Sequence, residues 1–302
     1  MLVENKEIVI NGNVIKIAKV KDEWYTDVEN PEKVIRALIN SGLRADIFSF
    51  WQRFPNVEVK YSYYYEWEKL SILPIKSYKQ WWEKQIHKSA RNHVRQASKK
   101  GVSVEVVKFT DDLVRGIASI YNETKIRQGK IFPHYGDDLD KVRRENSTYL
   151  DKSIFLAAYC NEELIGFIRL ILEEQFADII QILSKIEHRD KAPTNALIAK
   201  AVEVCEKRGI PYLAYGEWGK GGLKEFKIYN GFELRQVPRY YVPLNFRGRI
   251  ALKCQLHKGL IGMLPEKLIF FLLELRGRYY ERAERKEEKQ DLDPGFKVRK
   301  NA

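Results

Sequence analysis

Hydrophobic and polar positions change their spacing several times along this 302-residue chain. Residues 7–20 alternate around Asn11-Gly12, a pair typical of hairpin turns, so the pattern predicts an opening β-ribbon. Residues 31–43 have helical spacing and end near Gly42. The start of the chain is therefore expected to be a small α+β segment.

An aromatic-rich block covers residues 48–67. Within it, Val57, Val59 and Tyr61 alternate with charged neighbours, which predicts a strand with one solvent-exposed face. Interleaved aromatic and lysine side chains could stack nucleic-acid bases. We expect instead that the large rings fill a small core.

Helical spacing begins at Tyr78 and predicts one helix that runs to Lys100, with Gly101 as its C-cap. The apolar stripe of this helix consists of Trp82, Ile86, Ala90, Val94 and Ala97. A basic stripe consists of Lys84, Lys88, Arg91, Arg95 and Lys99. A run of charge is usually a solvated face, but bases in register also suit phosphates, and the pattern leaves both interpretations open.

The segment after Gly101 predicts the element order β-α-α-β-β-β-α-β-α-β. The strands are expected at 102–109, 154–160, 164–172, 177–186, 212–218 and 232–244, and the helices at 110–127, 137–145, 193–209 and 223–230. The turn between the strand at 177–186 and the next helix is rich in cations. Because the first turn of a helix has unpaired N–H groups and a positive dipole end, we expect this turn to hold anions.

Composition and charge narrow the class of protein. Hydrophobic and charged fractions of 44% and 31% are those of a folded chain. The 53 Lys and Arg against 41 Asp and Glu give a net charge of +12, which favours anionic partners. The three cysteines have neither metal-ligand spacing nor a disulfide pattern, so we expect a reducing cytoplasm and no metal. We expect no secretory signal and no membrane-spanning helix.

Several motifs resemble FemAB-like proteins, a group within the GNAT (N-acetyltransferase) superfamily. The motifs are Arg91, Arg95 and Lys99 before Gly101-Val102; Leu223 to Lys227 before Asn230-Gly231-Phe232; and Arg239 to Leu244. The resemblance covers about residues 45–245. It implies an α+β GNAT acyltransferase fold: a mixed, mostly antiparallel sheet flanked by helices, with a reduced N-terminal half and a C-terminal helical appendage.

The resemblance gives a division of the chain into four segments. These are a reduced GNAT-like half at 1–77, a basic linking helix at 78–101, the acyltransferase domain at 102–245 and a basic amphipathic tail at 246–302. Apolar residues flanked by arginines within 259–285 suit an anionic membrane interface, and docking on the protein's own core is the alternative.

The donor implied by the resemblance is an acyl-CoA, bound without a metal. Residues matching the donor site are Leu183, Ser184, Lys185, His188, Arg189, Lys191, Thr194 and Asn195. GNAT enzymes usually carry glycines at the pyrophosphate loop; residues 189–194 contain none, and Pro193 has no N–H. FemAB-like proteins often lack these glycines too.

Acyl transfer to an amine needs a general base and a group that stabilises the leaving thiolate. Glu217, at the end of the strand after the anion turn, is our candidate base. Lys227 and Tyr229 are candidates near the leaving group. The loop RQGKIFPHY contains Arg127, His134 and Tyr135, which suit an anionic or sugar-like acceptor.

Together these patterns predict an N-acyltransferase that moves an acyl group, rather than an aminoacyl group, from an acyl-CoA-type donor to an amine. The acceptor is expected to be an amino sugar, an amino acid or a lipid-linked envelope precursor, small and anionic or lipid-linked. One alternative is an aminoacyl-tRNA-dependent transferase of the FemAB type. Another is a nucleic-acid-binding or membrane-surface protein on a non-catalytic GNAT fold. The expected location is the cytoplasm, peripheral at the inner membrane face.

Overall fold

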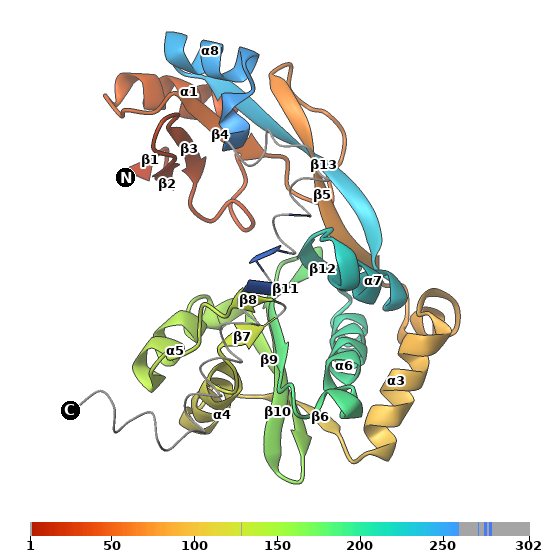
Figure 1. The fold of residues 1–302 in the computed structure, drawn as a ribbon. Coiled ribbons are helices and arrows are strands. Elements are labelled where there is room, and N and C mark those ends of the chain that lie inside the picture. The colour runs from red at the N-terminus through yellow and green to blue at the C-terminus, as the bar shows by residue number, and fades with distance from the viewer. Residues whose placement is uncertain (1, 128, 260–270, 272–274, 277, 280–302) are drawn as a thin grey trace, which may run out of the picture. The chain divides into compact units, whose positions relative to one another are not determined.

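The computed structural model describes residues 2–127, 129–259, 271, 275–276 and 278–279 (Figure 1). The chain forms two compact units. One unit comprises residues 1–108 and 149–259, and the other comprises 109–148 and 260–302. The division into segments 1–77, 78–101, 102–245 and 246–302 stays a prediction from the sequence.

The first unit is built on an 11-stranded sheet with the order β1-β2-β3-β4-β13-β5-β12-β11-β10-β9-β6. The strands are β1 (Leu2–Val3), β2 (Lys6–Asn11), β3 (Ile17–Val20), β4 (Ile47–Trp51), β5 (Tyr64–Pro74), β6 (Ser103–Val107), β9 (Ser153–Cys160), β10 (Glu163–Leu172), β11 (Phe176–Ser184), β12 (Tyr212–Glu217) and β13 (Glu233–Pro243). Neighbouring strands are antiparallel except β3–β4 and β11–β12. The mixed, mostly antiparallel α+β fold expected from the sequence is confirmed.

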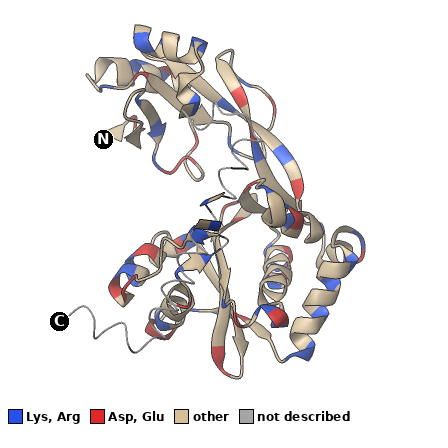
Figure 2. Cartoon of the chain, viewed as in Figure 1, with Lys and Arg blue, Asp and Glu red and all other residues tan. Residues whose placement is uncertain are grey.

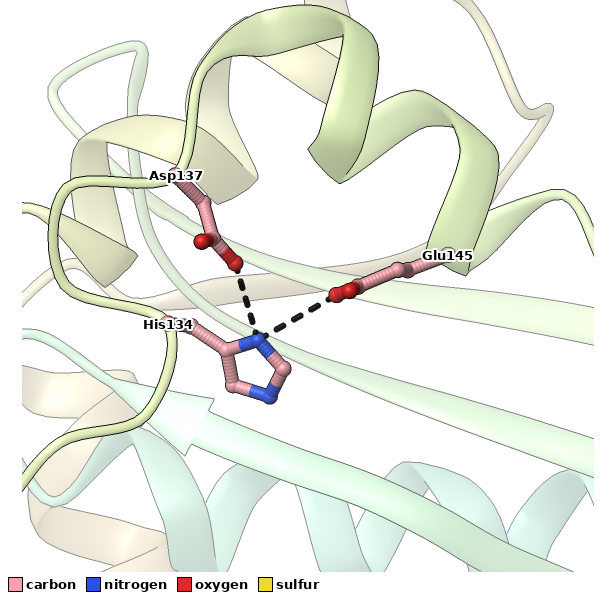
Figure 3. Close-up of side chains that lie close together, drawn as sticks. All are labelled: His134, Asp137 and Glu145. Atoms are coloured by element: carbon pink, nitrogen blue, oxygen red, sulfur yellow. Dashed lines mark hydrogen bonds and ion pairs between the residues drawn. The ribbon is translucent and has the colours of Figure 1, made fainter.

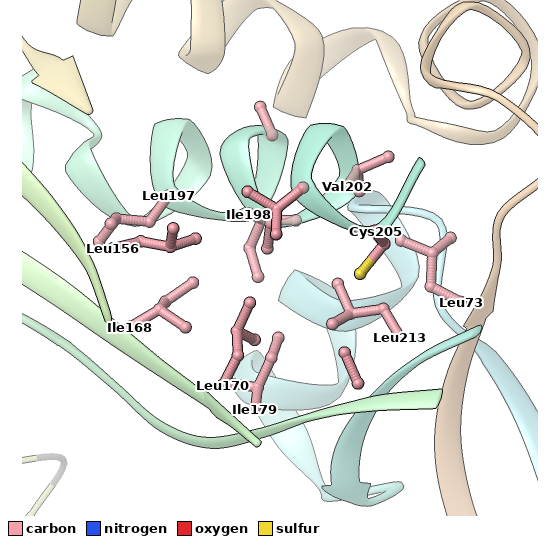
Figure 4. Close-up of a cluster of buried hydrophobic side chains, with 14 of the residues drawn as sticks. Leu73, Leu156, Ile168, Leu170, Ile179, Leu197, Ile198, Val202, Cys205 and Leu213 are labelled. Carbon is pink, nitrogen blue, oxygen red and sulfur yellow. The ribbon is translucent and has the colours of Figure 1, made fainter. Parts of the chain in front are cut away.

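The helical segments of this unit are α1 (Pro31–Asn40), α2 (Tyr78–Gln80), the π-helix η1 (Trp81–Gln85), α3 (Lys88–Lys99), α6 (Pro193–Lys207), α7 (Gly221–Tyr229) and α8 (Phe246–Lys253), with the short 3₁₀ segments η2 (Leu150–Lys152), η3 (Arg189–Lys191) and η4 (Leu256–Lys258). Helix α6 packs its apolar side on β9, β10, β11 and β12, as the buried cluster in Figure 4 shows. Helix α3 packs against α6.

The aromatic block forms a second core in the N-terminal half of this unit. The rings of Phe48, Phe50, Tyr61 and Tyr240 pack against one another, and Val34 and Leu38 of α1 belong to the same cluster. The interpretation of the aromatic block as a core is therefore confirmed for these rings. The strand predicted at Val57 to Tyr61 is wrong, because this segment is a loop whose Lys60 N–H donates to the Tyr240 hydroxyl at 2.8 Å.

The single helix predicted from Tyr78 to Lys100 is also corrected. Ile86 is extended, with ψ 131°, and ends the π-helix. His87 then starts α3 as its N-cap, accepting a hydrogen bond from the Ser89 N–H at 3.2 Å. The apolar period continues across the break, so Ile86, Ala90 and Ala97 are all buried despite the interruption. The periodicity indicated the buried face but not the break.

The second unit contains α4 (Asp111–Tyr121), the small hairpin β7 (Ile126–Arg127) and β8 (Lys130–Ile131), and α5 (Leu139–Asn146). Thr110 caps α4 and Asp138 caps α5 through side-chain oxygens, as residues that compete with the backbone do at helix starts. The described elements follow the order predicted after Gly101, with the hairpin added and β13 as one strand.

The tail predicted for 246–302 lies largely outside the described residues, and so does most of the membrane segment predicted at 259–285. Within the described part of the chain, no helix combines the length and the apolar character needed to cross a bilayer.

The core beneath α6 gives a stability prediction. Leu213 of β12 is fully buried in the cluster of Figure 4, so Leu213→Ala removes packing and leaves a cavity. We expect urea denaturation to show a loss of about 2–5 kcal/mol of unfolding free energy. The same substitution at the exposed Leu234 should cost less than about 1 kcal/mol. Equal losses at both positions would contradict the assignment of this core.

Candidate active site

The parallel strands β11 and β12 pair over only three residues and then separate. Their last pair is Asp178 with Ala214, whereas β11 continues to Ser184. Each strand has an irregular register just beyond this pair, against its other neighbour. Ile180 is an extra residue opposite β10, and one extra residue lies opposite β5 between Ala214 and Glu217. Such bulges bend strands away from their neighbours, so two of them open the sheet here.

Asp178 occupies the point of separation and is 4% exposed. Its Oδ2 accepts a hydrogen bond from the Tyr25 hydroxyl at 2.9 Å. Its Oδ1 has no hydrogen-bond partner among the described residues. Burial raises the pKa of Asp178 to about 6, while the Tyr25 hydrogen bond and the charge of Lys227 act in the opposite direction. A carboxyl group of this kind can take up a proton near neutral pH.

Lys227 of α7 reaches the bulge of β12. Its Nζ donates to the carbonyl oxygens of Tyr215 and Glu217 at 2.6 and 2.5 Å and lies 4.2 Å from the centre of the Tyr215 ring. The residue is only 2% exposed. Burial lowers the pKa of Lys227 to about 8, against the attraction of Glu217 and Asp178. This lysine therefore holds the opened strand and carries a proton that it can release near neutral pH.

Tyr25 belongs to the loop before α1, and neighbouring side chains hold this loop. Arg53 donates to the Tyr25 carbonyl at 3.1 Å and forms an ion pair with Glu173 at 3.3 Å. The Tyr25 ring also lies 5.4 Å from that of Tyr149. Burial, together with Asp178, raises the pKa of Tyr25, so its hydroxyl remains a donor. The N-terminal half thus supplies one of the contacts of Asp178.

The other predicted catalytic residues have different surroundings. The side chain of Glu217 is exposed, while its carbonyl oxygen accepts from Lys227 and from Ser71. Tyr229 is exposed too, and its ring stacks on His87 at 4.7 Å. Of the three candidates, Lys227 is the one that lies buried at the strand opening.

The predicted donor residues gather around the turn between β11 and α6. Lys185 contacts Glu163 and lies 3.4 Å from Glu187, and His188 Nε2 lies 3.1 Å from Glu163. Lys191 Nζ lies 2.6 Å from His188 Nδ1. The hydrogen bond from Lys185 lowers the pKa of Glu163, against the effect of burial. Lys185 and His188 thus have carboxylate partners.

The remaining donor residues shape the start of α6. The hydroxyls of Ser184 and Thr194 lie 3.1 Å apart, and Asn195 is buried with its Nδ2 donating to Asn230 at 3.2 Å. Leu183 pairs with Phe167 of β10. Arg189 is exposed in η3.

The helix α3 lies beside this turn. Lys100, just after α3, donates to the Asp190 carbonyl at 2.9 Å and pairs with its carboxylate at 2.8 Å, and Gln96 donates to the same carbonyl. Figure 2 shows Lys and Arg recurring along α3. Arg91 and Arg95 both lie over the Trp82 ring, 5.9 and 5.5 Å from its centre. The C-terminal end of α3 thus contacts the donor turn through Gln96 and Lys100, which are not part of the predicted basic stripe.

The predicted acceptor residues belong to the second unit. Arg127 donates to the Ile120 carbonyl at 2.6 Å and pairs with Glu123 at 2.9 Å, and Tyr135 is exposed. His134 Nδ1 lies 3.1 Å from Asp137 and 3.3 Å from Glu145, as Figure 3 shows. These residues belong to one compact unit and the strand opening to the other, so their role in binding the acceptor remains a prediction.

Among the described residues, two groups of side chains have ligand atoms close enough to hold a metal ion. They are His134, Asp137 and Glu145, and Glu163, Glu187 and His188. A lysine ammonium already contacts each group: Lys141 pairs with Asp137, and Lys185 with Glu163. Burial raises the pKa of Asp137, but hydrogen bonds from Lys141 and His134 outweigh it and keep the pKa low. Both groups are therefore charge-compensated by the chain itself.

Sequence reasoning missed Asp178 and Tyr25. Asp178 is the acidic residue within the apolar run Phe176–Ile180, and a charge inside a buried strand must be paired or shifted in pKa. That signal was available. Tyr25 had none, because it lies 153 positions away in the chain and meets Asp178 only through folding.

No protein-family model matches the chain, and no curated protein matches it either. Several solved structures are similar. One is FemX, with 11% identity, a TM-score of 0.57 and coverage of 82% of this chain and 86% of FemX. Another is the C-terminal domain (DUF2156) of a proposed lysylphosphatidylglycerol synthetase from Agrobacterium fabrum, with 14% identity, a TM-score of 0.56 and coverage of 85% and 87%.

A third similar structure is L-PGS from Bacillus licheniformis, with 12% identity, a TM-score of 0.52 and coverage of 79% of this chain and 81% of that chain. The matches span both the N-terminal half and the region around α6. At these identities they establish the fold, which is the FemAB-like GNAT fold that the sequence resemblance implied.

The buried lysine gives a prediction about stability and pH. The unfolded chain keeps the Lys227 proton up to about pH 10.5, whereas the folded chain releases it near the pKa of about 8. Between these values the unfolded state binds more protons, so unfolding free energy should rise with pH. The difference between wild type and Lys227→Met, measured by urea denaturation, should increase from about pH 7 to about pH 9.5. A constant difference would show that the pKa is not lowered.

Proposed function

We propose that this chain, which has the FemAB-like GNAT fold, is an N-acyltransferase that joins an acyl carbonyl to an amine where β11 and β12 separate. The observation that carries the proposal is Asp178, a buried carboxyl group with one unpartnered oxygen at the strand opening. Together with Lys227 it supplies the two proton-carrying groups that acyl transfer to an amine needs.

Asp178 serves as the general base. With a pKa of about 6 it is mostly ionised at pH 7, yet basic enough to accept a proton in the transition state. The proton leaves the attacking amine nitrogen for Oδ1 as the new N–C bond forms. The Tyr25 hydroxyl stays on Oδ2 and leaves Oδ1 to accept the proton.

Lys227 assists the opposite side of the reaction. An ammonium has three N–H donors, and two of them already bond the Tyr215 and Glu217 carbonyls. The positive charge stabilises the negative charge that develops on the carbonyl oxygen and then on the leaving sulfur or oxygen as its bond to carbon breaks. Backbone N–H groups of β11 beyond Asp178, where β12 no longer pairs, are candidates to polarise the carbonyl.

The donor we propose is an acyl-CoA, with its phosphates at the turn that carries Arg189 and Lys191. The turn precedes a 15-residue helix whose N-terminal end favours anions. An acyl thioester donor also fits the position of Lys227, because its leaving group is a thiolate, which one nearby cation stabilises. The acceptor is an amine on a small or lipid-linked molecule, as the sequence indicates.

An aminoacyl-tRNA donor is the second candidate, and specific observations favour it. The turn has no glycine, Pro193 offers no N–H, and the side chains of His188 and Lys185 already face carboxylates. The basic stripe of α3 is adjacent to the turn. Lysylphosphatidylglycerol, the product named for one of the similar structures, also carries an aminoacyl group.

The base assignment gives a pH prediction. Asp178 acts only when ionised, so kcat/KM should fall as the pH drops through about 6. Asp178→Asn should lower the rate by about 10²-fold or more. Tyr25→Phe removes a hydrogen bond that lowers the pKa of Asp178. In this variant the fall of kcat/KM at low pH should therefore begin at a higher pH, and the rate should recover in alkaline buffer.

Two results would contradict these roles separately. An active Asp178→Asn enzyme would exclude Asp178 as the base. If Asp178→Asn is inactive but the pH dependence of kcat/KM in Tyr25→Phe is unshifted, Asp178 remains the base. In that case Tyr25 does not tune its pKa. Glu217→Gln is the matched control, because its exposed carboxylate is the base that the sequence suggested.

The donor is tested by product formation. Purified protein is given an amine acceptor panel with either acetyl-CoA or aminoacyl-tRNA, and products are detected by mass spectrometry. With acyl-CoA as the donor, Arg189→Ala with Lys191→Ala should raise the KM for the donor about tenfold and change kcat little. If products form with aminoacyl-tRNA alone, and Arg95→Gln on α3 lowers their yield, the donor is aminoacyl-tRNA and not acyl-CoA.

A further inference from the structure

Helix α8 presents a face that the described chain leaves uncovered. Residues along a helix follow one another at about 100°, so Phe246, Arg249, Ile250 and Lys253 share one side. Gly248 and Ala251, on the opposite side, are buried. The outward face therefore combines two apolar and two cationic side chains, with Phe246 75% and Ile250 46% exposed.

The backbone holds this helix firmly in place. The Asn245 side chain caps it by accepting from the Gly248 N–H at 2.8 Å and donates to the Ala45 carbonyl at 3.1 Å. A Cβ at Gly248 would lie 1.9 Å from the Asp46 carbonyl oxygen, so the helix lies directly on that segment. The outward direction of Phe246 and Ile250 is thus fixed by a close backbone contact rather than by a loose end of the chain.

A third exposed apolar side chain lies beside the helix. Arg247 donates to the carbonyl oxygen of Val14, and Val14 is 71% exposed in the loop between β2 and β3. Phe246 and Ile250 are the apolar part of a surface that we name the α8 face, and Arg249 and Lys253 are its cationic part.

The charge of this surface is one-sided. Residues 245–258 contain Arg247, Arg249, Lys253 and Lys258 but no Asp or Glu. Lys258 and His257 turn to Glu66 of β5, whereas Arg249 and Lys253 are exposed. A second copy of this chain would bring the same cations against each other across a two-fold axis, which is unfavourable. A partner that binds the α8 face should therefore present both negative charge and apolar surface.

We propose that the α8 face docks this protein on an anionic lipid bilayer. Phe246 and Ile250 enter the boundary between headgroups and acyl chains, and Arg249 and Lys253 remain among the lipid phosphates. Long cationic side chains can do this because their stems are apolar and their charged ends reach outwards. A rigid short helix inserts without the cost of ordering a disordered segment.

The native cysteines supply a direct test with the full-length chain. Cys160 and Cys205 are buried, whereas Cys254, directly after α8, is exposed. An environment-sensitive fluorophore on Cys254 therefore reports on the α8 face. Titration with vesicles of phosphatidylcholine mixed with phosphatidylglycerol should shift its emission to the blue, and vesicles of phosphatidylcholine alone should leave it unchanged. Added salt should weaken the binding.

Substitutions separate the two parts of the surface. Arg249→Gln with Lys253→Gln should weaken partitioning onto anionic vesicles by roughly 25-fold, about fivefold per cation. Phe246→Ser with Ile250→Ser should abolish the blue shift and weaken binding at least about tenfold. Each part of the surface has a matched control. For the cations it is Lys84→Gln with Lys88→Gln, which removes the same charge from the exposed face of the η1–α3 segment. For the apolar side chains it is Val106→Ser, which removes an exposed apolar side chain on β6.

Several outcomes would overturn the proposal. Wild-type binding by the α8 variants would assign any lipid attachment to another part of the chain. An equal loss in the Lys84/Lys88 control would reduce the effect to net charge. If Cys254 resists labelling in the absence of lipid, the chain itself covers the α8 face. If the protein forms a dimer that Phe246→Ser dissociates, a second copy of the chain binds there.

Discussion

The separation of β11 from β12 is the constraint on which the candidate site depends. Two parallel strands that stayed paired beyond Asp178 would satisfy their facing backbone groups in a ladder. The irregularities at Ile180 and at Tyr215–Gly216 interrupt that ladder from both sides. Lys227 then compensates the cost, because its Nζ bonds the carbonyl oxygens around the β12 bulge. The same lysine that stabilises the opening is placed to take part in the chemistry.

The N-terminal half contributes to the candidate site as well as to the sheet. Strands β4, β13 and β5 continue the sheet beyond β12, and the loop with Tyr25 reaches Asp178. Removing this half would leave both carboxylate oxygens of Asp178 without a hydrogen-bond partner among the described residues. A buried carboxyl group with no donor would be protonated over a wider pH range, so a smaller fraction of it would be ionised to act as a base at neutral pH. The contact between the halves therefore tunes the proposed reaction.

Charge in this protein is organised in separate places. Lys185 near the start of α6 is matched by Glu163 and Glu187, whereas Lys84, Lys88, Arg95 and Lys99 of the basic stripe and Arg249 and Lys253 of α8 are exposed. A net charge of +12 would not distinguish these situations. Only the positions of the carboxylates do, because the field at a binding site depends on nearby pairs more than on the sum over the chain.

The sequence by itself determined the element order and the buried face of the segment from Trp82 to Ala97, because apolar spacing reports directly on local burial. It also indicated Lys227. Tertiary structure decided the break at Ile86, the loop at 57–61 and the pairing of Asp178 with Tyr25. These features depend on hydrogen bonds and on the low polarity created by residues distant in the chain, which no local pattern encodes.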